Sequence, residues 1–417
     1  MKAPDVTRLA TAAGAAATLG LVFAAYSTYD YAAQLDRQLH AVHCSFVPGA
    51  PAPADGDNPC KTALFSAYSA VLRASWWGGV PISLFAVGAF GFLLAFAVYL
   101  ALARGRPARW AHAFFAAAAL GPLGASLVMG TISLTRLHVL CKLCVGIYVS
   151  SAALAAAAIA AWRLVAGDRG EPAAGAPPSQ GAARAAPSRH EMLRVLSWAG
   201  ALGVATLLPA IVYVALLPDY RPFLEKCGKL ATAAEPHGSL LKLPTARPTR
   251  AVTLFEDPLC PTCKAFHERL VDEGVFEKLD VTLVMFPLDS ECNWMVDRAL
   301  HPGACTMAKA VLCGRADRAR AILEWSYEQQ DDLARAGKQG ADALLAKLRE
   351  RWGTDLLTCV GAKTTAAQLN QHLHFAANNH IPVSTPQMFL GDRRICDEDT
   401  DLGMKYTLAQ LAPEVLP

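Results

Sequence analysis

Residues 251–263 read AVTLFEDPLCPTC, and this stretch decides how the C-terminal part of the chain folds. Ala251 to Phe255 predicts a buried strand, and Cys260 to Glu273 predicts a helix that begins at the CxxC motif. A helix N-terminus offers unpaired N–H groups and positive partial charge, which stabilise a thiolate at the first cysteine. We therefore expect Cys260 to be a nucleophilic thiol and Cys263 to be the resolving thiol.

Two other interpretations of this CxxC motif are a static disulfide and half of a zinc site. A zinc site needs two more ligands, and this part of the sequence has no second CxxC and no His pair with metal spacing. No metal site is therefore predicted. We expect the scattered histidines of this region to be surface residues: His267, His301, His372, His374 and His380.

The sequence that follows predicts an α/β domain. Val281 to Phe286 reads as a second strand, Met307 to Arg351 as a largely helical stretch, and Thr364 to Asn378 as another helix. Met388 to Leu390 and Arg394 to Cys396, joined through a Gly-Asp turn, read as a closing hairpin. The predicted order of elements is therefore strand, helix, strand, helical insert, helix and hairpin.

Thr385-Pro386 stands just before this hairpin. With the CxxC motif, it makes the region resemble the thioredoxin superfamily, and the helical insert makes it similar to DsbA. The resemblance implies that Pro386 is cis and lies beside the active disulfide, and that Thr385 next to it receives the substrate chain. Thr262 stands where strongly oxidising members of this family carry His.

The composition of the whole chain places this domain in a membrane protein. The 417 residues are 53% hydrophobic and 18% charged, with a mean hydropathy of +0.27, which argues against an ordinary cytosolic enzyme. The net charge of +3 and the lack of a basic run interleaved with aromatics argue against a nucleic-acid partner. Twelve cysteines point to an oxidising compartment.

Five apolar runs are long enough to cross a membrane, at about 20 residues each. They lie near Leu9 to Tyr29, Val80 to Ala103, Trp110 to Leu134, Leu140 to Trp162 and Val195 to Leu217. The first could also be a secretory signal, but the other four make the protein polytopic in any case. If the spans alternate, the following residues share one side, which we expect to be cytoplasmic: Lys2, Arg8, Arg104, Arg106, Arg109, Arg163, Arg169, Arg184, Arg189 and Arg194.

The predicted organisation is a transmembrane four-helix bundle over residues 1–165, a cytoplasmic linker over 166–194, a fifth transmembrane helix over 195–217 and an α/β domain over 218–417. All twelve cysteines then fall on the outer side. Six of them, in the last domain, allow fifteen pairings, which the sequence does not decide: Cys227, Cys292, Cys305, Cys313, Cys359 and Cys396. Cys292 with Cys305 is the pair expected first, and Cys227 could tie the domain to its stem.

A second set of cysteines lies in the bundle. Cys141 and Cys144 form a CxxC motif at the outer end of the fourth span, where three-residue spacing puts both on one helix face. A lipid-soluble electron acceptor could reach a thiol at this depth. Cys44 and Cys60 lie in the long loop after the first span. They could simply staple this loop, or carry a thiol pair between two partners.

This part of the chain has four spans, paired loop cysteines and a CxxC motif followed four residues later by Tyr148. In these features, residues 10–163 resemble the vitamin K epoxide reductase family. By that resemblance, Cys144 faces a quinone, Cys141 exchanges with Cys60, and Cys44 receives electrons from the thioredoxin-like domain. Ser66 matches a loop Ser or Thr of the family, and Tyr148 would hydrogen-bond a quinone carbonyl. Ser66-Ala67-Tyr68-Ser69 resembles the bacterial branch, in which a thioredoxin-like domain is often fused.

Together these features predict a disulfide-forming oxidoreductase of a bacterial inner membrane, with its thioredoxin-like domain in the periplasm. Reduced secreted or periplasmic clients would pass electrons to Cys260 and Cys263, then through Cys44, Cys60, Cys141 and Cys144 to ubiquinone or menaquinone in the lipid. Reverse electron flow, as in a membrane thiol reductase or isomerase, is one alternative. A membrane-anchored metal chaperone that uses a CxxC motif is another.

Overall fold

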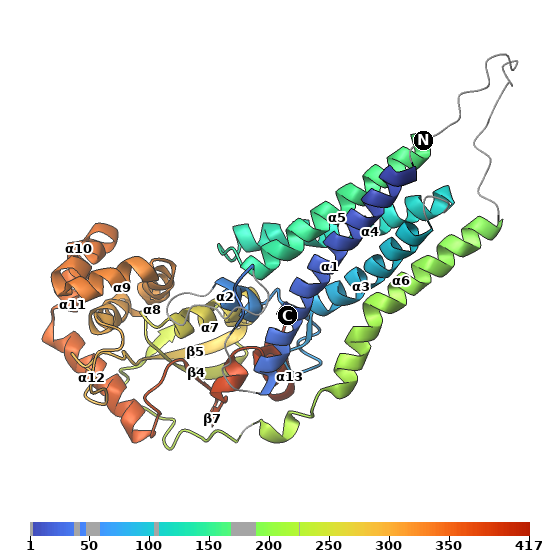
Figure 1. The fold of residues 1–417 in the computed structure, drawn as a ribbon. Coiled ribbons are helices and arrows are strands. Elements are labelled where there is room, and N and C mark those ends of the chain that lie inside the picture. Colours follow the sequence, from blue (N-terminus) through green and yellow to red (C-terminus); the bar gives the residue numbers. More distant parts are fainter. Residues whose placement is uncertain (1–2, 37–41, 47–58, 104–107, 168–188, 225) are drawn as a thin grey trace, which may run out of the picture. The chain divides into compact units, whose positions relative to one another are not determined.

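The computed structural model describes residues 3–36, 42–46, 59–103, 108–167, 189–224 and 226–417. The chain divides into two compact units. The first comprises residues 1–72 and 80–218, and the second comprises residues 73–79 and 219–417. Figure 1 shows the elements of both units along the chain.

Five helices make up most of the first unit, and the described residues give them as α1 Ala3–Ala33, α3 Ile82–Leu102, α4 Arg109–Thr135, α5 Lys142–Gly167 and α6 Arg189–Leu216. Each is long and apolar enough to cross a membrane. The five spans expected from the sequence are therefore confirmed as helices. Short elements follow α1: α2 Pro59–Phe65, and a ribbon of β1 Ala70–Val71 and β2 Val80–Pro81.

Helix α1 packs against α3 and α5, α5 also packs against α4, and α6 packs against α3 (Figure 1). Small residues allow these close approaches. A Cβ atom added to Gly88 on α3 would lie 2.1 Å from the carbonyl oxygen of Ala205 on α6. Gly20 on α1 is likewise covered by the ring of Phe90. The bundle core is therefore built of alanines and glycines with a few large rings between them.

The predicted linker, residues 166–194, lies mostly outside the described residues, as do Arg104 and Arg106. Its two described ends are helical. Residues up to Gly167 belong to α5, and α6 begins at Arg189, several residues before the span expected from Val195. A polar first turn extends this apolar helix, because backbone hydrogen bonding does not stop where the hydrophobic residues stop.

The second unit contains a five-stranded sheet in the order β3-β5-β4-β6-β7. Its strands are β3 Leu241–Leu243, β4 Arg250–Glu256, β5 Leu279–Met285, β6 Gln387–Leu390 and β7 Arg393–Arg394. Strands β4 and β5 are parallel, whereas β6 pairs with β4 in the antiparallel direction. The expected strands and hairpin are confirmed, while β3 was not predicted because three residues give too short an alternation.

Helix α7, Pro261–Asp272, connects the parallel strands. The insert then runs through α8 Ala304–Glu328, α9 Gln330–Gln339, α10 Ala341–Trp352 and α11 Thr354–Val360, and α12 Lys363–Asn378 leads back to the sheet. Helix α13, Met404–Leu411, follows the hairpin. The α/β domain with a helical insertion, expected from the sequence, is confirmed.

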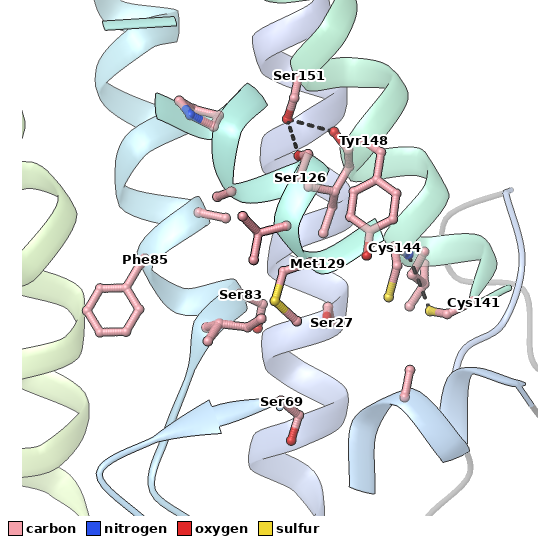
Figure 2. Close-up of a pocket in the computed structure, with 18 of the residues that line it drawn as sticks. Ser27, Ser69, Ser83, Phe85, Ser126, Met129, Cys141, Cys144, Tyr148 and Ser151 are labelled. Atoms are coloured by element: carbon pink, nitrogen blue, oxygen red, sulfur yellow. Dashed lines mark hydrogen bonds between the residues drawn. The ribbon is translucent and has the colours of Figure 1, made fainter. Parts of the chain in front are cut away.

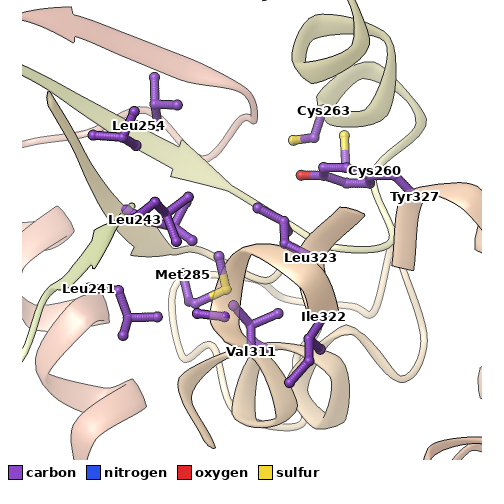
Figure 3. Packing of buried hydrophobic residues seen from close by; sticks show 14 of the residues in the cluster. Leu241, Leu243, Leu254, Cys260, Cys263, Met285, Val311, Ile322, Leu323 and Tyr327 are labelled. Carbon is purple, nitrogen blue, oxygen red and sulfur yellow. The ribbon is translucent and has the colours of Figure 1, made fainter. Parts of the chain in front are cut away.

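One large hydrophobic cluster joins the sheet of the second unit to its helical insert (Figure 3). Leu254 and Met285 contribute from the sheet, and Val311 and Leu323 from α8. Cys260 and Cys263 belong to the same cluster. The redox motif is therefore anchored in the best-packed part of the unit.

Three disulfides hold the second unit, and they use the six cysteines that the sequence left unpaired: Cys227–Cys396, Cys292–Cys305 and Cys313–Cys359. The expected pair Cys292–Cys305 is confirmed. Cys227 bonds to Cys396, beyond the hairpin, and so ties the start of this unit to its last strands.

The prediction that the histidines lie on the surface is wrong for His267, which is 3% exposed, and for His372, which is fully buried. His301 is described with the site below. The Nδ1 atom of His372 accepts a hydrogen bond from the backbone N–H of Met285, and its Nε2 lies 2.9 Å from the carbonyl oxygen of Ser239. Burial lowers the pKa of His372 to about 4, so it is neutral and serves as a bridge within the core. His374 and His380 are exposed, as expected.

Candidate functional site

The first cysteine cluster lies at the end of the membrane bundle. Cys44 and Cys60 form a disulfide, whereas Cys141 and Cys144 are free thiols. The backbone N–H of Cys144 donates a hydrogen bond to the Sγ atom of Cys141 over 3.3 Å. That bond exists because Cys141 immediately precedes α5 and Cys144 stands in its first turn. A hydrogen bond from the Cys144 side chain holds the pKa of Cys141 below its ordinary value.

A cavity of about 620 Å³ brings these cysteines together (Figure 2). Cys60 of α2 lines it together with Cys141, Cys144 and Tyr148, and Ser66 lies on the same wall. Cys44 joins this group through its disulfide with Cys60. The structure thus gathers every residue that the sequence singled out in the bundle.

Most of the cavity wall is apolar, with few polar groups. Ser126 on α4 donates a hydrogen bond to Ser151 on α5 over 2.9 Å, and Ser151 donates to the carbonyl oxygen of Ile147 (Figure 2). Met129 and Phe85 add polarisable and aromatic surface. A volume of this size, mostly apolar with a few polar groups, suits a flat lipid-soluble ring.

Asp30 is a member of the cavity wall that the sequence analysis missed. It is 1% exposed and lies on α1. Its carboxylate accepts hydrogen bonds from the backbone N–H and the Nδ1 of His43. The signal was an acidic residue near the end of an apolar span, which is rare in a membrane helix unless it has a partner or a function.

The second cysteine cluster is the CxxC motif of the second unit. Cys260 is the N-cap of α7, and Pro261 occupies the first helical position. The Sγ atom of Cys260 lies 3.1 Å from the Oγ1 of Thr262, and it donates to the carbonyl oxygen of Thr385 over 3.6 Å. The Thr385-Pro386 bond is cis, as expected. Thr385 and Pro386 therefore stand beside the first cysteine of the motif.

Hydrogen bonds separate the acidities of the two thiols. A hydrogen bond from Cys263 lowers the pKa of Cys260 to about 6, and Thr262 and Thr385 add to the shift. Burial raises the pKa of Cys263, which has no exposed surface. At neutral pH, Cys260 is therefore a thiolate and Cys263 a thiol.

Two acidic residues lie just before the motif. Asp257 is fully buried, and its carboxylate accepts hydrogen bonds from the backbone N–H groups of Leu259 and Leu288. It also lies 2.7 Å from the Nδ1 of His301. Burial lowers the pKa of His301, but the hydrogen bond and the charge of Asp257 outweigh burial and raise it overall. His301 is therefore a partner of the loop that carries Cys260, and the prediction of a plain surface histidine is wrong.

Glu256 lies deeper, behind the motif. It has no exposed surface, and its Oε2 accepts a hydrogen bond from the Tyr327 hydroxyl over 3.0 Å. Figure 3 shows Tyr327 beside Cys260 and Cys263. Burial raises the pKa of Glu256. A strand-end acid has no distinctive sequence spacing, so only the packing of α8 on the sheet reveals this contact.

Among the described residues, no group of three or more His, Cys, Asp or Glu is arranged to hold a metal ion. The chemistry that the two cysteine clusters do support is thiol–disulfide exchange, because each has a thiol pair on a helix start.

Comparisons with known proteins agree with this description. Residues 11–159 match the profile of the vitamin K epoxide reductase family. No curated protein matches the chain.

One solved structure that resembles the chain is a thioredoxin-like oxidoreductase from Silicibacter pomeroyi DSS-3, with 18% sequence identity and a TM-score of 0.26. The alignment covers 39% of this chain and 86% of the other. Another is ScsC of Proteus mirabilis in a compact conformation, with 14% sequence identity and a TM-score of 0.29. The alignment covers 54% of this chain and 99% of ScsC.

The family match covers the bundle with its paired cysteines. The second unit has, in its own sheet order, a parallel strand-helix-strand unit followed by a hairpin, with the CxxC motif at the helix start and a cis-proline beside it. Residues 11–159 thus match the vitamin K epoxide reductase family, and the second unit that follows has a thioredoxin-like arrangement of sheet, CxxC helix and cis-proline.

Proposed function

We propose that the protein forms disulfides in client proteins outside the cytoplasm and passes the electrons to a quinone in the membrane. The observation that carries the proposal is the shared cavity. Cys60 from the loop, Cys141 and Cys144 from α5, and Tyr148 all line one mostly apolar space. A thiol relay and a lipid-soluble acceptor could meet there.

The relay begins in the thioredoxin-like domain. A client thiolate attacks the Cys260–Cys263 disulfide at Cys260, Cys263 leaves, and a second client thiolate then displaces Cys260 to close the client disulfide. Cys260, with a pKa of about 6, is a good leaving group in that second step. A thiol that is stable as a thiolate also favours the reduced form of the pair, and this supports electron flow from client to enzyme.

Electrons then pass to the loop and to α5. The reduced thioredoxin-like domain would exchange with Cys44, and Cys60 would exchange with Cys141. The structure has Cys44 bonded to Cys60 and Cys141 and Cys144 as thiols.

A quinone suits the cavity as the final acceptor. The surface of the cavity is mostly apolar, and its polar lining consists of hydroxyl groups, the cysteines and Asp30. Tyr148 stands one helical turn from Cys144. A quinone, whether ubiquinone or menaquinone, supplies a two-electron acceptor when it is bound. Cys144 would face it, the Tyr148 hydroxyl would orient a carbonyl oxygen, and Ser66 would contribute to the loop wall.

The membrane would be the inner membrane of a bacterium, with the thioredoxin-like domain in the periplasm. The Lys and Arg residues that flank the five spans support this orientation, since they gather at the ends that would face the cytoplasm. All twelve cysteines then share the oxidising side.

Quinone reduction by the purified full-length protein, with a reduced client peptide or with dithiothreitol as donor, tests the proposal. We expect Cys260→Ala to stop client oxidation but to keep dithiothreitol-driven quinone reduction, and Cys144→Ala to abolish both. A Cys292→Ala/Cys305→Ala double variant, which removes a disulfide outside both thiol clusters, is the matched control and should keep both activities. Quinone reduction that survives Cys144→Ala would refute the assignment of the membrane site.

A further inference from the structure

Among the described residues that line the cavity beside Cys141, Asp30 is the one with a charged side chain. Its side chain is 2% exposed, on a helix that is long and apolar enough to cross a membrane. Burying a carboxylate in such a setting is costly, and intramembrane acids usually have a partner and a function. The proposed relay, as described so far, gives Asp30 no role.

His43 is the partner of this carboxylate. Its backbone N–H donates to Oδ2 of Asp30 over 2.8 Å, and its Nδ1 lies 2.5 Å from Oδ1. The imidazole ring also packs against Tyr26 and Tyr29, with centroid distances of 5.3 and 6.3 Å. Since Nδ1 is engaged by Asp30, Nε2 is the ring nitrogen left for proton exchange.

The side chains of His43 and Asp30 differ in their exposure to solvent. The His43 side chain is 24% exposed, while Asp30 is almost completely buried. His43 is also the residue directly before Cys44, whose disulfide partner Cys60 lines the cavity with Asp30. A titratable side chain thus adjoins Cys44 in the sequence and is hydrogen-bonded to a carboxylate of the cavity wall.

Electron transfer at this point requires protons to move separately. The Cys60 thiolate attacks Cys141, so a Cys60–Cys141 bond forms and Cys144 leaves with the electron pair of the broken disulfide. The Cys44 thiol must then lose its proton, attack Cys60 and release Cys141 as a thiolate. Two electrons move from the loop to α5, and the proton that Cys44 loses is taken up by the pair of thiolates formed by Cys141 and Cys144.

We propose that His43 accepts the proton of Cys44 in this second step and that Asp30 is a positioning residue that holds the imidazole and stabilises its protonated form. The proton then passes to the pair of thiolates formed by Cys141 and Cys144. While it rests on His43, it cancels the charge of Asp30 at the moment when a second negative charge appears on Cys141. The inference rests on the proposed transfer from the loop pair to the α5 pair.

The titratable groups that face this pair come from two elements. Helix α1 contributes Tyr26, Tyr29 and Tyr31, while Cys141, Cys144 and Tyr148 lie at and within α5. The pKa of the Cys141 thiol is also lowered, so a pH dependence of the rate does not by itself identify the group that titrates. Only the part of the pH dependence that disappears when His43 is replaced is attributed to His43.

The test follows electron transfer inside the full-length protein without quinone. Fully oxidised protein receives one equivalent of dithiothreitol, and acid quenching, alkylation and peptide mass spectrometry then report the thiols on the loop and on α5. His43→Asn is the informative variant, because an amide N–H at the place of Nδ1 can still donate to Asp30 but cannot take up a proton. We expect its transfer rate to fall roughly 100-fold, its rise with pH near neutrality to disappear, and free imidazole to restore part of the rate.

Two further variants separate proton transfer from simple anchoring of the loop. Asp30→Asn keeps an acceptor but removes the charge, so the imidazole loses stabilisation of its protonated form and the rising limb of the pH profile should move to lower pH. His138→Asn, which changes an exposed histidine just before Cys141, is the matched control and should behave like the wild type.

The outcomes are distinct. If His43→Asn transfers electrons at the wild-type rate at every pH, or loses the rate without imidazole rescue and with an unchanged pH profile, His43 only anchors the loop and the proposal is overturned. If the wild type itself never reduces the α5 pair, the proposed function fails instead. Alkylation of the resting variants confirms that the Cys44–Cys60 disulfide still forms.

Discussion

At the scale of single residues, Cys260 shows how local geometry sets reactivity. Its thiolate is stabilised by hydrogen bonds from the side chains of Cys263, Thr262 and Thr385, which lie near it because the residue is the N-cap of α7 and the cis-proline segment passes beside it. Thr262 supplies a hydroxyl whose Oγ1 lies 3.1 Å from the sulfur of Cys260.

Removing that hydroxyl should raise the pKa of Cys260. Reduced full-length Thr262→Ala should require a higher pH than the wild type, whose midpoint is about 6, before Cys260 is alkylated at its maximal rate, because only the thiolate reacts. Peptide-resolved mass spectrometry after timed iodoacetamide treatment measures this midpoint. Thr262→Ser keeps the hydroxyl and should match the wild type. Identical midpoints for Ala and Ser would mean that Thr262 contributes nothing.

His301 should make the stability of the thioredoxin-like domain depend on pH. Its pKa is raised in the folded state by Asp257, so the contribution is complete below its unfolded pKa of about 6.5 and is lost as pH rises through the higher folded value. We expect the melting temperature of this unit to fall over that window in the wild type and to fall less in His301→Gln. Thermal melts across pH 5.5 to 8.5 measure it, with exposed His374→Gln as the control. Parallel curves for all three proteins would contradict the prediction.

At the scale of elements, the crossing of α3 and α6 depends on one small residue. Gly88 faces the backbone of Ala205 and Thr206, where a Cβ atom would approach to 2.1 and 2.8 Å. Backbone atoms cannot rotate away as a flexible side chain can, so any larger residue must separate the helices.

Gly88→Ala should therefore loosen α6 from the bundle. We expect a lower melting temperature in detergent and faster proteolysis at α6, in line with the cost of about 1–3 kcal/mol for overpacking. Gly91→Ala, one turn further on the same helix, meets no atom within 4 Å and should be neutral or stabilising, since Ala is the better helix former. Equal melting temperatures for the two variants would show that the close approach is not maintained in the membrane.

At the scale of the whole molecule, the chain combines two modules whose chemistry is the same but whose surroundings differ. In the bundle, the thiols border an apolar cavity between membrane-length helices, while in the thioredoxin-like domain they border a packed core. Covalent linkage would keep the two thiol clusters at an effective concentration in the mM range, so exchange would not depend on chance encounters.

The proposed orientation predicts which sites can be labelled from outside the cell. In a background without the four cysteines that form no disulfide, Cys141, Cys144, Cys260 and Cys263, a cysteine at Asp219, after α6, should react with a membrane-impermeant maleimide in intact cells. The reason is that the proposed orientation puts this end in the periplasm. A cysteine at His190, at the start of α6, should react only after the cells are opened. Both positions are exposed. The reverse labelling pattern would place the thioredoxin-like domain in the cytoplasm and refute the proposed function.

The sequence by itself determined the spans, the α/β order and the cysteine motifs, because hydrophobic period, span length and CxxC spacing are local properties of the chain. It also pointed correctly to Cys292–Cys305, whose partners are close in sequence. Only tertiary structure revealed Asp30 with His43, Asp257 with His301, and the bridge made by His372. Each is a polar group whose role depends on a partner from another segment, and a linear pattern carries no information about which buried groups will meet.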